Sequence, residues 1–559
     1  MRGVANSHSM NAPTRDVLHS PTRRPEASSS RGAAIYQIYP RSFADSNGDG
    51  IGDLPGITAR LDYVAKLGVN GIWLSPFYTS PMMDFGYDIA DYRDVDPIFG
   101  TLTDFDALIA RAHHLGLKVI VDQVYAHTSD KHAWFLSSRD DPEGPHGDWY
   151  VWHDPKRDGT PPNNWQSVFG GPAWTWDGRR RQYYMHTFLK EQPQINGHNP
   201  AVQEALLDVA RFWLDRGVDG FRLDALNHMM FDAQLRNNPA RPAGKGARTR
   251  PFDYQIRRYS QSDPAILPFI EQIRALTDDY PGTFTVAEVG GDDGPREMRL
   301  FTQGDTRLNT AYGFDFLYAP KLTPRLIADA LTGWPDSPGM GWPSWAFENH
   351  DAPRAVSRWV APEHRADFAR MKMLLLASLR GNVFLYQGEE LGLTQVDIPF
   401  EKLQDPEAIA NWPLTLSRDG ARTPMPWSAD ATNCGFSTAT DTWLPVGEDH
   451  AALAVDVQEA DDTSLLHWTR TCLNLRRNHP ALQLGSVEIL HVDKSLLAFR
   501  REQADEALLC LFNLGDTARR IPTRLQTDGA ILSAMGGADM RLLPPYSGVI
   551  GALPSRDRG

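Results

Sequence analysis

Short apolar runs alternate along most of the chain with stretches in which apolar residues recur every three or four positions. A short apolar run is typical of a buried parallel strand, and the wider spacing is typical of an amphipathic helix. The alternation therefore predicts βα units around a parallel sheet. We expect eight strands, within residues 34–43, 69–77, 118–124, 217–226, 284–290, 311–317, 343–351 and 381–390.

The end signals of helices fall between these strands. Gly68 and Gly116 each follow an amphipathic stretch and predict its end, and Asn199 followed by Pro200 predicts the start of another helix. After the eighth strand, residues 464–482 are predicted to form one long helix. Eight strands with intervening helices are the number found in a (β/α)8 TIM barrel, an α/β fold.

Two regions depart from the βα rhythm. Residues 127–196 are dense in Trp, Gly, Pro and Asp, and a structureless loop of that length is rare in a compact domain, so we predict an inserted subdomain after the third strand. From residue 483 onward, short alternating segments separated by turns predict a C-terminal antiparallel β-domain. The predicted division is a disordered leader at 1–31, a barrel at 32–126 and 197–482 with an excursion at about 391–449, an inserted subdomain at 127–196 and a β-domain at 483–559.

Composition narrows the class of protein. The chain has 559 residues, with 56 Lys+Arg against 70 Asp+Glu and a net charge of −14. Such a charge repels phosphate backbones, so we expect no nucleic acid partner. The chain has no uninterrupted apolar run long enough to predict a membrane span. Three widely spaced cysteines and an N-terminus without a secretory apolar core predict a reducing, cytoplasmic location.

Polar residues end several of the predicted strands. In a TIM barrel the carboxyl ends of the strands form the catalytic face, so these side chains are expected to lie together. Each one taken singly could be a solvated rim residue or a structural ion partner, but their matching positions favour a common function. They are Asp122 with His127 shortly after it, Arg222, Asp224, Glu288, His350 and Asp351.

Carboxylates gathered in this way suit the cleavage of glycosidic bonds. One carboxylate must stay ionised beside the anomeric carbon, and a second must hold a proton for the departing oxygen. Arg222, two residues before Asp224 on the same strand face, is expected to keep Asp224 ionised. The apolar neighbours of Glu288 are expected to raise the pKa of its carboxyl group.

Ten segments in order carry a family resemblance: AIYQIYPRSF, DSNGDGIGDLPGI, GYDIADY, DQVYAHTS, QPQIN, GFRLDAL, AEVGG, FENHD, YQGEELGL and ARTPMPW. The chain resembles glycoside hydrolase family 13, the α-amylase family, in its branch of α-glucosidases and oligo-1,6-glucosidases. The resemblance implies that Asp224 is the nucleophile, Glu288 the acid/base and Asp351 a third carboxylate that binds sugar hydroxyls. It also implies a retaining double displacement, with carboxyl groups about 5–5.5 Å apart.

The same resemblance implies a pocket closed at one end. Asp84 and Arg422 match a pair that grips the terminal glucose, so attack at the non-reducing end by an exo-acting α-glucosidase is expected. Its substrates would be small α-glucosides, with water, alcohols or sugars as acceptors. Ordinary packing is the alternative for the aromatic members. The implied substrate-binding residues are Asp84, Tyr87, His127, Phe169, Arg222, His350 and Arg422.

An acidic loop near the N-terminus has oxygen-bearing residues at every second position, as in the first nine positions of a calcium loop. Its twelfth position is Gly56 instead of Glu, so it is not a full EF-hand. The resemblance implies a structural Ca²⁺ or Mg²⁺ and no cofactor for catalysis, and an acidic turn without metal is the alternative. The candidate ligands are Asp45, Asn47, Asp49, the carbonyl of Ile51, and Asp53.

Three positions depart from the wider family. Ala126 replaces the Asn that ligates calcium in α-amylases, so that calcium site is expected to be absent. Gln194 replaces an Asp found in many relatives, which puts the local support of the acid/base in question. Ala225, a small residue after the nucleophile, resembles enzymes that prefer α-1,4 links, whereas valine resembles those that prefer α-1,6 links.

The acceptor remains open at this point. The Arg- and Gly-rich loop at residues 241–263 could shape the acceptor site or could be a solvated loop. Alternatives to a maltose-type α-glucosidase are a sucrose-acting glucosyltransferase or isomerase and an α-1,6-glucosidase. A catalytically inactive barrel that serves as a partner subunit would need a lost triad, and all three carboxylates are present.

Overall fold

The computed structural model describes residues 30–244, 248–335, 337, 339–414 and 416–553, so all but the last two residues of the predicted leader lie outside it. Its central feature is a sheet of eight parallel strands. These strands are β1 (Ala34–Ile38), β2 (Gly71–Leu74), β5 (Lys118–Val124), β9 (Gly220–Asp224), β10 (Phe284–Val289), β11 (Thr310–Gly313), β12 (Ser344–Ala346) and β13 (Asn382–Tyr386).

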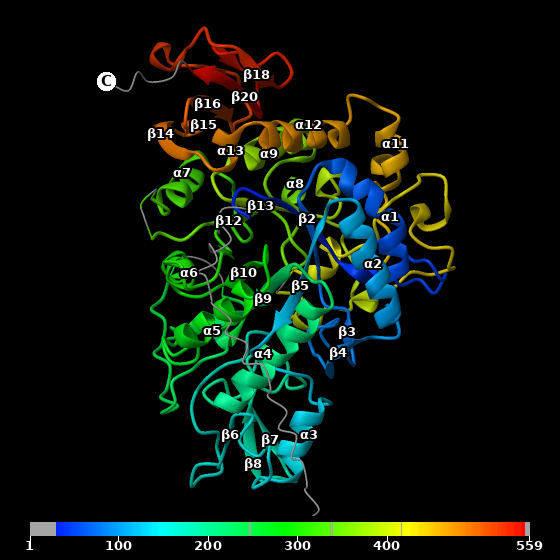
Figure 1. Cartoon of the computed structure of the whole chain (residues 1–559), viewed down its shortest axis with the longest axis vertical. Coiled ribbons are helices and arrows are strands. Elements are labelled where there is room, and N and C mark those ends of the chain that lie inside the picture. The colour runs from blue at the N-terminus through cyan, green and yellow to red at the C-terminus, as the bar shows by residue number, and fades with distance from the viewer. Residues whose placement is uncertain (1–29, 245–247, 336, 338, 415, 554–559) are drawn as a thin grey trace, which may run out of the picture.

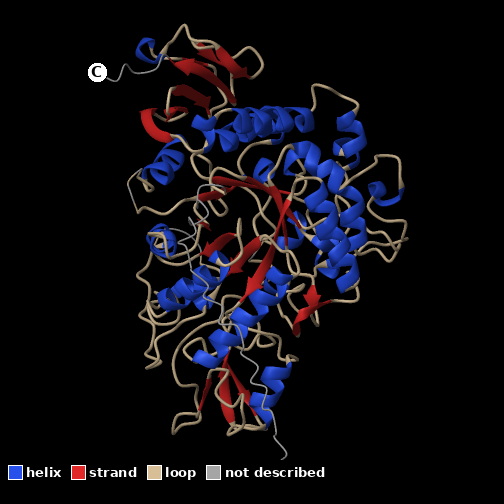
Figure 2. Cartoon of the chain, in the orientation of Figure 1, coloured by secondary structure: helices blue, strands red, loops and turns tan. Residues whose placement is uncertain are grey.

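The strands follow the order β11-β10-β9-β5-β2-β1-β13-β12, so that each lies beside its neighbours in the βα sequence. A parallel bridge between Ala311 and Pro343 brings the two edge strands together and nearly closes the sheet. Strands lie at the centre and helices surround them (Figures 1 and 2). The predicted α/β fold, a (β/α)8 TIM barrel, is confirmed.

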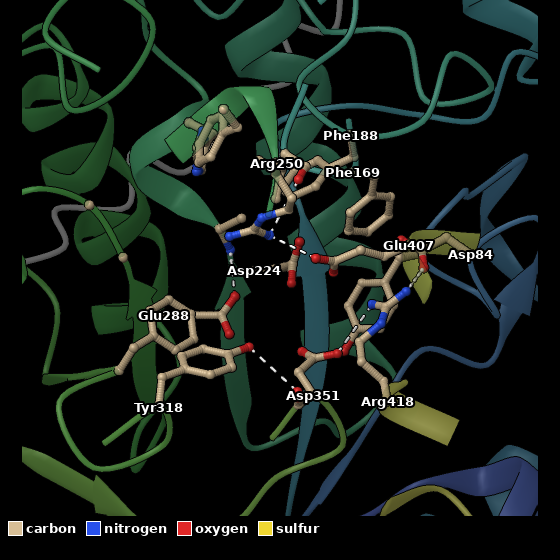
Figure 3. A pocket seen from close by; sticks show the side chains of 18 of the residues that line it. Asp84, Phe169, Phe188, Asp224, Arg250, Glu288, Tyr318, Asp351, Glu407 and Arg418 are labelled. Atoms are coloured by element: carbon tan, nitrogen blue, oxygen red, sulfur yellow. Dashed lines mark hydrogen bonds and ion pairs between the residues drawn. The ribbon is translucent and has the colours of Figure 1, made fainter. Parts of the chain in front are cut away.

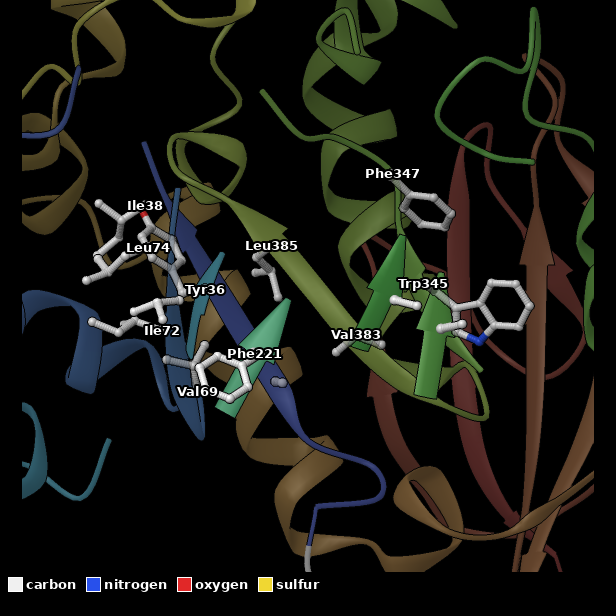
Figure 4. Close-up of a cluster of buried hydrophobic side chains, with 14 of the residues drawn as sticks. Tyr36, Ile38, Val69, Ile72, Leu74, Phe221, Trp345, Phe347, Val383 and Leu385 are labelled. Carbon is white, nitrogen blue, oxygen red and sulfur yellow. The ribbon is translucent and has the colours of Figure 1, made fainter. Parts of the chain in front are cut away.

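Alternation along the strands separates an outer from an inner set of side chains. Outward residues such as Tyr36 and Ile38 pack in the large core between the strands and the helices (Figure 4). Arg222, Asp224 and Glu288 have the inward parity, which directs their polar groups into the barrel. The inner cluster includes Ile35, Trp73, Ile120, Val286, Tyr312 and Phe384.

The helices begin and end at the predicted signals. Asn199 caps α4 and accepts a hydrogen bond from the Ala201 N–H, and Gly68 ends α1 in the left-handed region. The helices are α1 (Leu54–Leu67), α2 (Leu102–His114), α3 (Ala133–Asp140), α4 (Pro200–Asp215), α5 (Ile266–Asp278), α6 (Gly294–Thr302), α7 (Pro324–Thr332), α8 (Ala355–Arg358), α9 (Arg365–Ser378), α10 (Pro406–Ala410), α11 (Val455–Glu459), α12 (Leu465–Asn478) and α13 (Pro480–Gln483).

The last predicted helix is divided in two. It was expected to run through residues 464–482, but α12 ends at Asn478 and α13 begins at Pro480. Proline lacks an N–H and clashes with the preceding turn, so the chain bends there.

Among the described residues, no helix has both the length and the apolar character that crossing a bilayer requires.

Two further units accompany the barrel. The segment after β5 holds α3 and a three-stranded antiparallel sheet of β6 (Trp152–His153), β8 (Gln182–Met185) and β7 (Trp174–Asp177), and a short pair, β3 (Tyr78–Thr79) and β4 (Asp91–Val95), precedes it. The C-terminal unit is antiparallel, as predicted. Its strands are β14 (Ser486–Val492), β15 (Leu496–Gln503), β16 (Glu506–Asn513), β20 (Ser547–Leu553) and β18 (Ile531–Ala534), with the pair β17 (Arg519–Arg520) and β19 (Leu542–Leu543).

Candidate active site

A cavity of about 570 Å³ lies at the carboxyl ends of the barrel strands. The carboxylates of Asp224, Glu288 and Asp351 point into it (Figure 3). Segments from the insertion and from the loops after β9 and β13 complete its walls. Of the predicted site residues, those that line it are Asp84, Tyr87, His127, Phe169, Asp224, Glu288 and Asp351.

Arg222 connects the buried carboxylates beneath this cavity. Its Nη1 lies 2.6 Å from Asp122 Oδ1 and 2.6 Å from Asp224 Oδ1, and its Nη2 lies 2.6 Å from Glu288 Oε1. The guanidinium has no exposed surface. Arg222 and Asp122 therefore hold the catalytic-face carboxylates from behind and do not themselves line the cavity.

The backbone after Asp224 also contacts Glu288. Ala225 adopts the left-handed conformation, with φ 39° and ψ 37°, which is uncommon for a residue other than glycine. This turn lets the Ala225 N–H donate to Glu288 Oε2 at 3.1 Å. The Tyr312 hydroxyl donates to the other oxygen, Oε1, at 3.2 Å. Glu288 is thus held at both oxygens.

Burial dominates the protonation of the pair. It raises the pKa of Asp224 to about 7 and the pKa of Glu288 to about 7, although Arg222 opposes both shifts. The predicted contact between Arg222 and Asp224 is present, but Arg222 also contacts Asp122 and Glu288. One guanidinium is shared among three carboxylates, so Asp224 and Glu288 form a coupled pair that titrates near neutral pH.

Asp351 has the opposite electrostatic setting. Burial raises the pKa of its carboxyl group, but Arg422 and Arg418 outweigh burial and hold the pKa well below its usual value. Because burial lowers the pKa of His350 to about 3, His350 is uncharged at neutral pH and the arginines provide the positive charge. Arg422 Nη2 lies 2.7 Å and Arg418 Nη1 lies 3.3 Å from Asp351 Oδ1.

The predicted pairing of Asp84 with Arg422 is wrong. Asp84 Oδ1 instead lies 3.1 Å from Arg418 Nη2, whereas Arg422 is 1% exposed and donates to the carbonyl oxygen of His350 at 2.7 Å. Arg418 lies four residues before Arg422 in the sequence and lines the cavity, where its side chain contacts both Asp84 and Asp351. Arg422 orients Asp351 from behind.

The two predicted histidines lie in the same region. His127 Nε2 is 3.1 Å from Gln192 Nε2, which also donates to Asp84 Oδ2 at 3.1 Å. His350 Nε2 is 2.7 Å from the Tyr87 hydroxyl. His127 lines the cavity, and His350 acts from behind it.

Aromatic rings complete this end of the cavity. The Phe169 ring lies under the guanidinium of Arg418, with 4.9 Å between the guanidinium carbon and the ring centroid. Phe188 contacts both Phe169 and His127, at centroid distances of 5.6 and 5.2 Å. Tyr87 and Phe169 are each 7% exposed and line the cavity, so they can contact a small ligand there.

Residues 37–485 match the family described as α-amylase, catalytic domain. The chain belongs to the α-amylase family. It is 51% identical over 498 residues to a probable α-glucosidase of Rhizobium meliloti (strain 1021), which covers 87% of this chain and 90% of that protein. It is 36% identical over 516 residues to an oligo-1,6-glucosidase of Parageobacillus thermoglucosidasius, with the same two coverages.

Solved structures agree with this assignment. The α-glucosyl transfer enzyme XgtA superposes with a TM-score of 0.89 at 48% identity, over 93% of this chain and 99% of that one. The trehalulose synthase MutB of Pseudomonas mesoacidophila MX-45 superposes with a TM-score of 0.84 at 31% identity, over 93% and 98%. The chain is therefore a glycoside hydrolase of the α-glucosidase and oligo-1,6-glucosidase branch of the α-amylase family.

Two positions that depart from the α-amylase family have structural partners here. Gln194 accepts from the Thr187 hydroxyl at 2.7 Å, within the inserted segment, and donates to the His228 carbonyl at 2.9 Å. The second bond connects the inserted segment to the loop after β9. Ala126 is fully buried, and its carbonyl accepts the Ile195 N–H. Its methyl group offers no metal ligand.

The acidic loop has the oxygen donors of a hard-cation site. Asp45 Oδ2 accepts the Gly50 N–H at 2.8 Å, and Asp53 caps α1 by accepting the Gly56 N–H. Asn47 and Asp49 accept N–H groups within the same loop. The side chains of this loop offer oxygen donors, the donor type that Ca²⁺ and Mg²⁺ prefer. Among the described residues, however, no three His, Cys, Asp or Glu side chains converge as metal ligands.

Sequence reasoning missed several side chains of the site. Arg418 lies in the segment SRDGAR, four residues before the predicted Arg422. The sequence therefore showed a second arginine near Arg422 as a candidate for the same role. Gln192 opens QPQIN, the segment in which only Gln194 was considered. Arg250 lies in the Arg- and Gly-rich loop that the sequence marked for the acceptor site, although the residue itself was not singled out. Tyr312 and Glu407 carry no local signal, because only the fold brings Glu407 to the cavity and Tyr312 to Glu288.

Proposed function

We propose that this glycoside hydrolase is a retaining, exo-acting α-glucosidase that removes terminal glucose from short α-1,4-linked substrates and can transfer it to acceptors. Asp224 attacks the anomeric carbon, Glu288 protonates the departing oxygen, and Asp351 binds the sugar hydroxyls. One observation carries this proposal: Asp224 and Glu288 face the same cavity, share Arg222, and both have a pKa of about 7.

The coupled pair suits a double displacement. With one proton on Glu288, the Asp224 carboxylate carries the negative charge and forms a bond to the anomeric carbon as the glycosidic oxygen takes the Glu288 proton. Glu288, now ionised, removes a proton from water or from an alcohol. The oxygen of that molecule attacks the same carbon and releases Asp224. Two inversions leave the configuration unchanged.

The end of the cavity supports exo-attack. Arg418 bridges Asp84 and Asp351, and Gln192 bridges Asp84 and His127, so polar groups converge on a single sugar unit. These groups donate to and accept from hydroxyl groups, and the Phe169 ring contributes an apolar wall. A chain cannot pass through this end, which favours the terminal glucose.

Linkage and acceptor preference rest on the mouth of the cavity. Ala225 lines it with a methyl group, and the resemblance links a small residue there with α-1,4 preference. Leu414 and Leu416, 66% and 63% exposed, give the mouth an apolar rim, which favours an organic acceptor as well as water. The similarity to oligo-1,6-glucosidases and to a trehalulose synthase keeps α-1,6 cleavage and sucrose isomerisation as the alternatives.

Two experiments test the proposal. Asp224→Asn is expected to lower turnover of an aryl α-glucoside by about 10³-fold or more while leaving the circular dichroism spectrum unchanged. Near-normal activity in the folded variant would refute the nucleophile assignment. Rates on maltose, isomaltose, sucrose and soluble starch, with products identified, test the specificity, and rapid starch depolymerisation would refute the closed pocket.

Two further proposals concern the whole protein. We propose that residues 45–53 bind a structural Ca²⁺ or Mg²⁺ that has no part in the chemistry, supported by the all-oxygen donor set. We also propose a cytoplasmic location, supported by the three cysteines, Cys434, Cys472 and Cys510, which are all free thiols. Fractionation of the native cells tests the location.

A further inference from the structure

The imidazole of His350 lies buried behind the catalytic cavity, and its two nitrogens face different surroundings. The ring is stacked between Tyr39 and Tyr87, with centroid distances of 5.6 and 5.4 Å. This packing fixes the orientation of the ring. Burial lowers the pKa of His350 to about 3, so the ring is uncharged at neutral pH and only one nitrogen carries a proton. The neighbours of each nitrogen decide which one it is.

The groups around Nε2 require a donor at this nitrogen. Nε2 of His350 lies 3.3 Å from Asp351 Oδ2 and 2.7 Å from the Tyr87 hydroxyl. Asp351 is ionised and can only accept. The Tyr87 hydroxyl also lies 3.4 Å from Asp122 Oδ2, and both oxygens of Asp122 face N–H donors, so Asp122 accepts from Tyr87. The oxygen of Tyr87 is then left to accept the Nε2–H.

Gln37 faces the other nitrogen. Its Nε2 lies 2.8 Å from His350 Nδ1 and donates to Ser75 Oγ at 3.1 Å. An amide nitrogen has two N–H groups and accepts no hydrogen bond, so these two partners use both of them. A donor at this distance is compatible only with a lone pair on Nδ1. Gln37 therefore favours the same tautomer that the carboxylates on the far side of the ring require.

The barrel holds Gln37 in this position. Gln37 lies on β1 with the inward parity of Ile35, and it is 1% exposed. Its backbone is paired with Trp73 of β2 and with Tyr386 of β13. The side chain lies beneath the cavity and does not line it, so an effect of Gln37 on a bound sugar has to pass through His350.

We propose that Gln37 is a positioning residue that fixes the proton of His350 on Nε2. From there the N–H group holds Asp351 and Tyr87 in place against the terminal glucose. In the opposite tautomer the Nε2 lone pair faces Asp351 Oδ2, and the Tyr87 hydroxyl has to leave Asp122 in order to donate to Nε2. This inference rests on the sugar-binding role proposed for Asp351 and adds a residue that does not touch the substrate.

A double-mutant cycle tests the inference, with kcat/KM measured on an aryl α-glucoside and on maltose. Gln37→Met keeps the length of the side chain and removes its N–H groups. It is expected to lower kcat/KM by about fivefold to tenfold in the wild-type background, the scale of one neutral hydrogen bond, and by less than about twofold in the His350→Ala background. Equal losses in the two backgrounds, or no loss in either, would overturn the inference.

Gln458→Met is the matched control. Gln458 is also buried, at 7% exposed, and donates to the Leu391 carbonyl at 2.9 Å, but it does not line the cavity. This variant is expected to lower the Tm and to change kcat/KM less than about twofold. A loss of kcat/KM as large as that of Gln37→Met would show a general effect of losing a buried amide and would overturn the assignment.

Neutron diffraction from the deuterated wild-type protein tests the tautomer without any variant. Deuterium is expected on Nε2 of His350 and not on Nδ1, and deuterium on Nδ1 would overturn the inference. A wild-type enzyme that cleaves neither the aryl α-glucoside nor maltose would overturn the proposed function instead, and the neutron result would still decide the tautomer.

Discussion

Arg222 can neutralise only one of the three buried carboxylates that it contacts, and burial raises the pKa of Asp224 and of Glu288 to about 7, so this pair holds about one proton near neutral pH. A single shared proton makes one carboxyl group the acid and leaves the other ionised, which is the state that a retaining mechanism needs. Asp351 differs because the arginines beside it keep it ionised.

Activity is therefore expected to depend on pH as a bell centred near pH 7. Loss of the shared proton removes the acid above neutral pH, and a second proton removes the nucleophile below it, since both groups have a pKa of about 7. The kcat/KM of an aryl α-glucoside with a good leaving group, measured from pH 4 to pH 10, checks the profile. A plateau that extends from pH 7 to pH 10 would contradict it.

Stability is expected to respond in opposite directions to two isosteric variants. The pKa of Glu288 is about 7 in the folded state and 4.5 ordinarily, so the folded protein keeps a proton that the unfolded chain releases, and wild-type stability falls as pH rises between these values. Glu288→Gln removes this loss and is expected to stabilise the protein at pH 8 by about 1–3 kcal/mol, with little effect at pH 4.5.

Asp351→Asn provides the contrasting case. The pKa of Asp351 is depressed, so its stabilising effect is present above its ordinary pKa of 3.8 and is lost as pH falls below that value. The variant is expected to destabilise the protein at pH 8 by about 1–3 kcal/mol, because both arginine contacts lose their charge partner. Urea unfolding at the two pH values measures both variants, and shifts of the same sign at pH 8 would contradict the electrostatic account.

At the scale of the elements, regular patterns predicted more than irregular segments did. Short apolar runs located all eight strands, and they placed Asp224 and Glu288 in the site because both residues end such runs. Arg418 lies in a segment without periodicity, where only the packing of separate loops selects it over Arg422.

The acidic loop before α1 gives a prediction at this scale. If residues 45–53 hold a divalent cation, EDTA is expected to lower the Tm of the wild-type protein by several degrees, and excess Ca²⁺ or Mg²⁺ to restore it. Asp49→Ala is expected to abolish the response, since Asp49 is exposed and caps no helix. Differential scanning calorimetry checks this, and an identical Tm with and without EDTA would contradict the metal site.

At the scale of the whole molecule, a buried arginine joins the barrel to the helices that precede the C-terminal β-domain. Arg476 of α12 is 2% exposed and donates to backbone carbonyls of Gly32, Ala377, Leu379, Gly381 and Leu482. These carbonyls come from the turn before β1, the C-terminal end of α9 and the residue after it, the turn before β13, and α13. No alternation or spacing in the sequence marked this role, because its partners are main-chain groups.

Replacing this side chain is expected to weaken the junction. Arg476→Met leaves several buried carbonyls without a donor and is expected to cost about 3 kcal/mol or more of unfolding free energy. Arg477→Met is the matched control, because Arg477 is the exposed neighbour on the same helix, and its effect is expected to stay within about 0.5 kcal/mol. Equal Tm values for the two variants would contradict the junction role.

The central claim, that Asp224 is the nucleophile of a retaining α-glucosidase, is tested most directly by trapping the intermediate. A slow fluorinated α-glucosyl donor is incubated with the enzyme, which is then digested and analysed by peptide mass spectrometry. The account predicts one added fluoroglucosyl group on the peptide that contains Asp224, carried by that carboxylate. A label on Glu288 or Asp351, or turnover of the donor with inverted configuration and no labelled peptide, would contradict it.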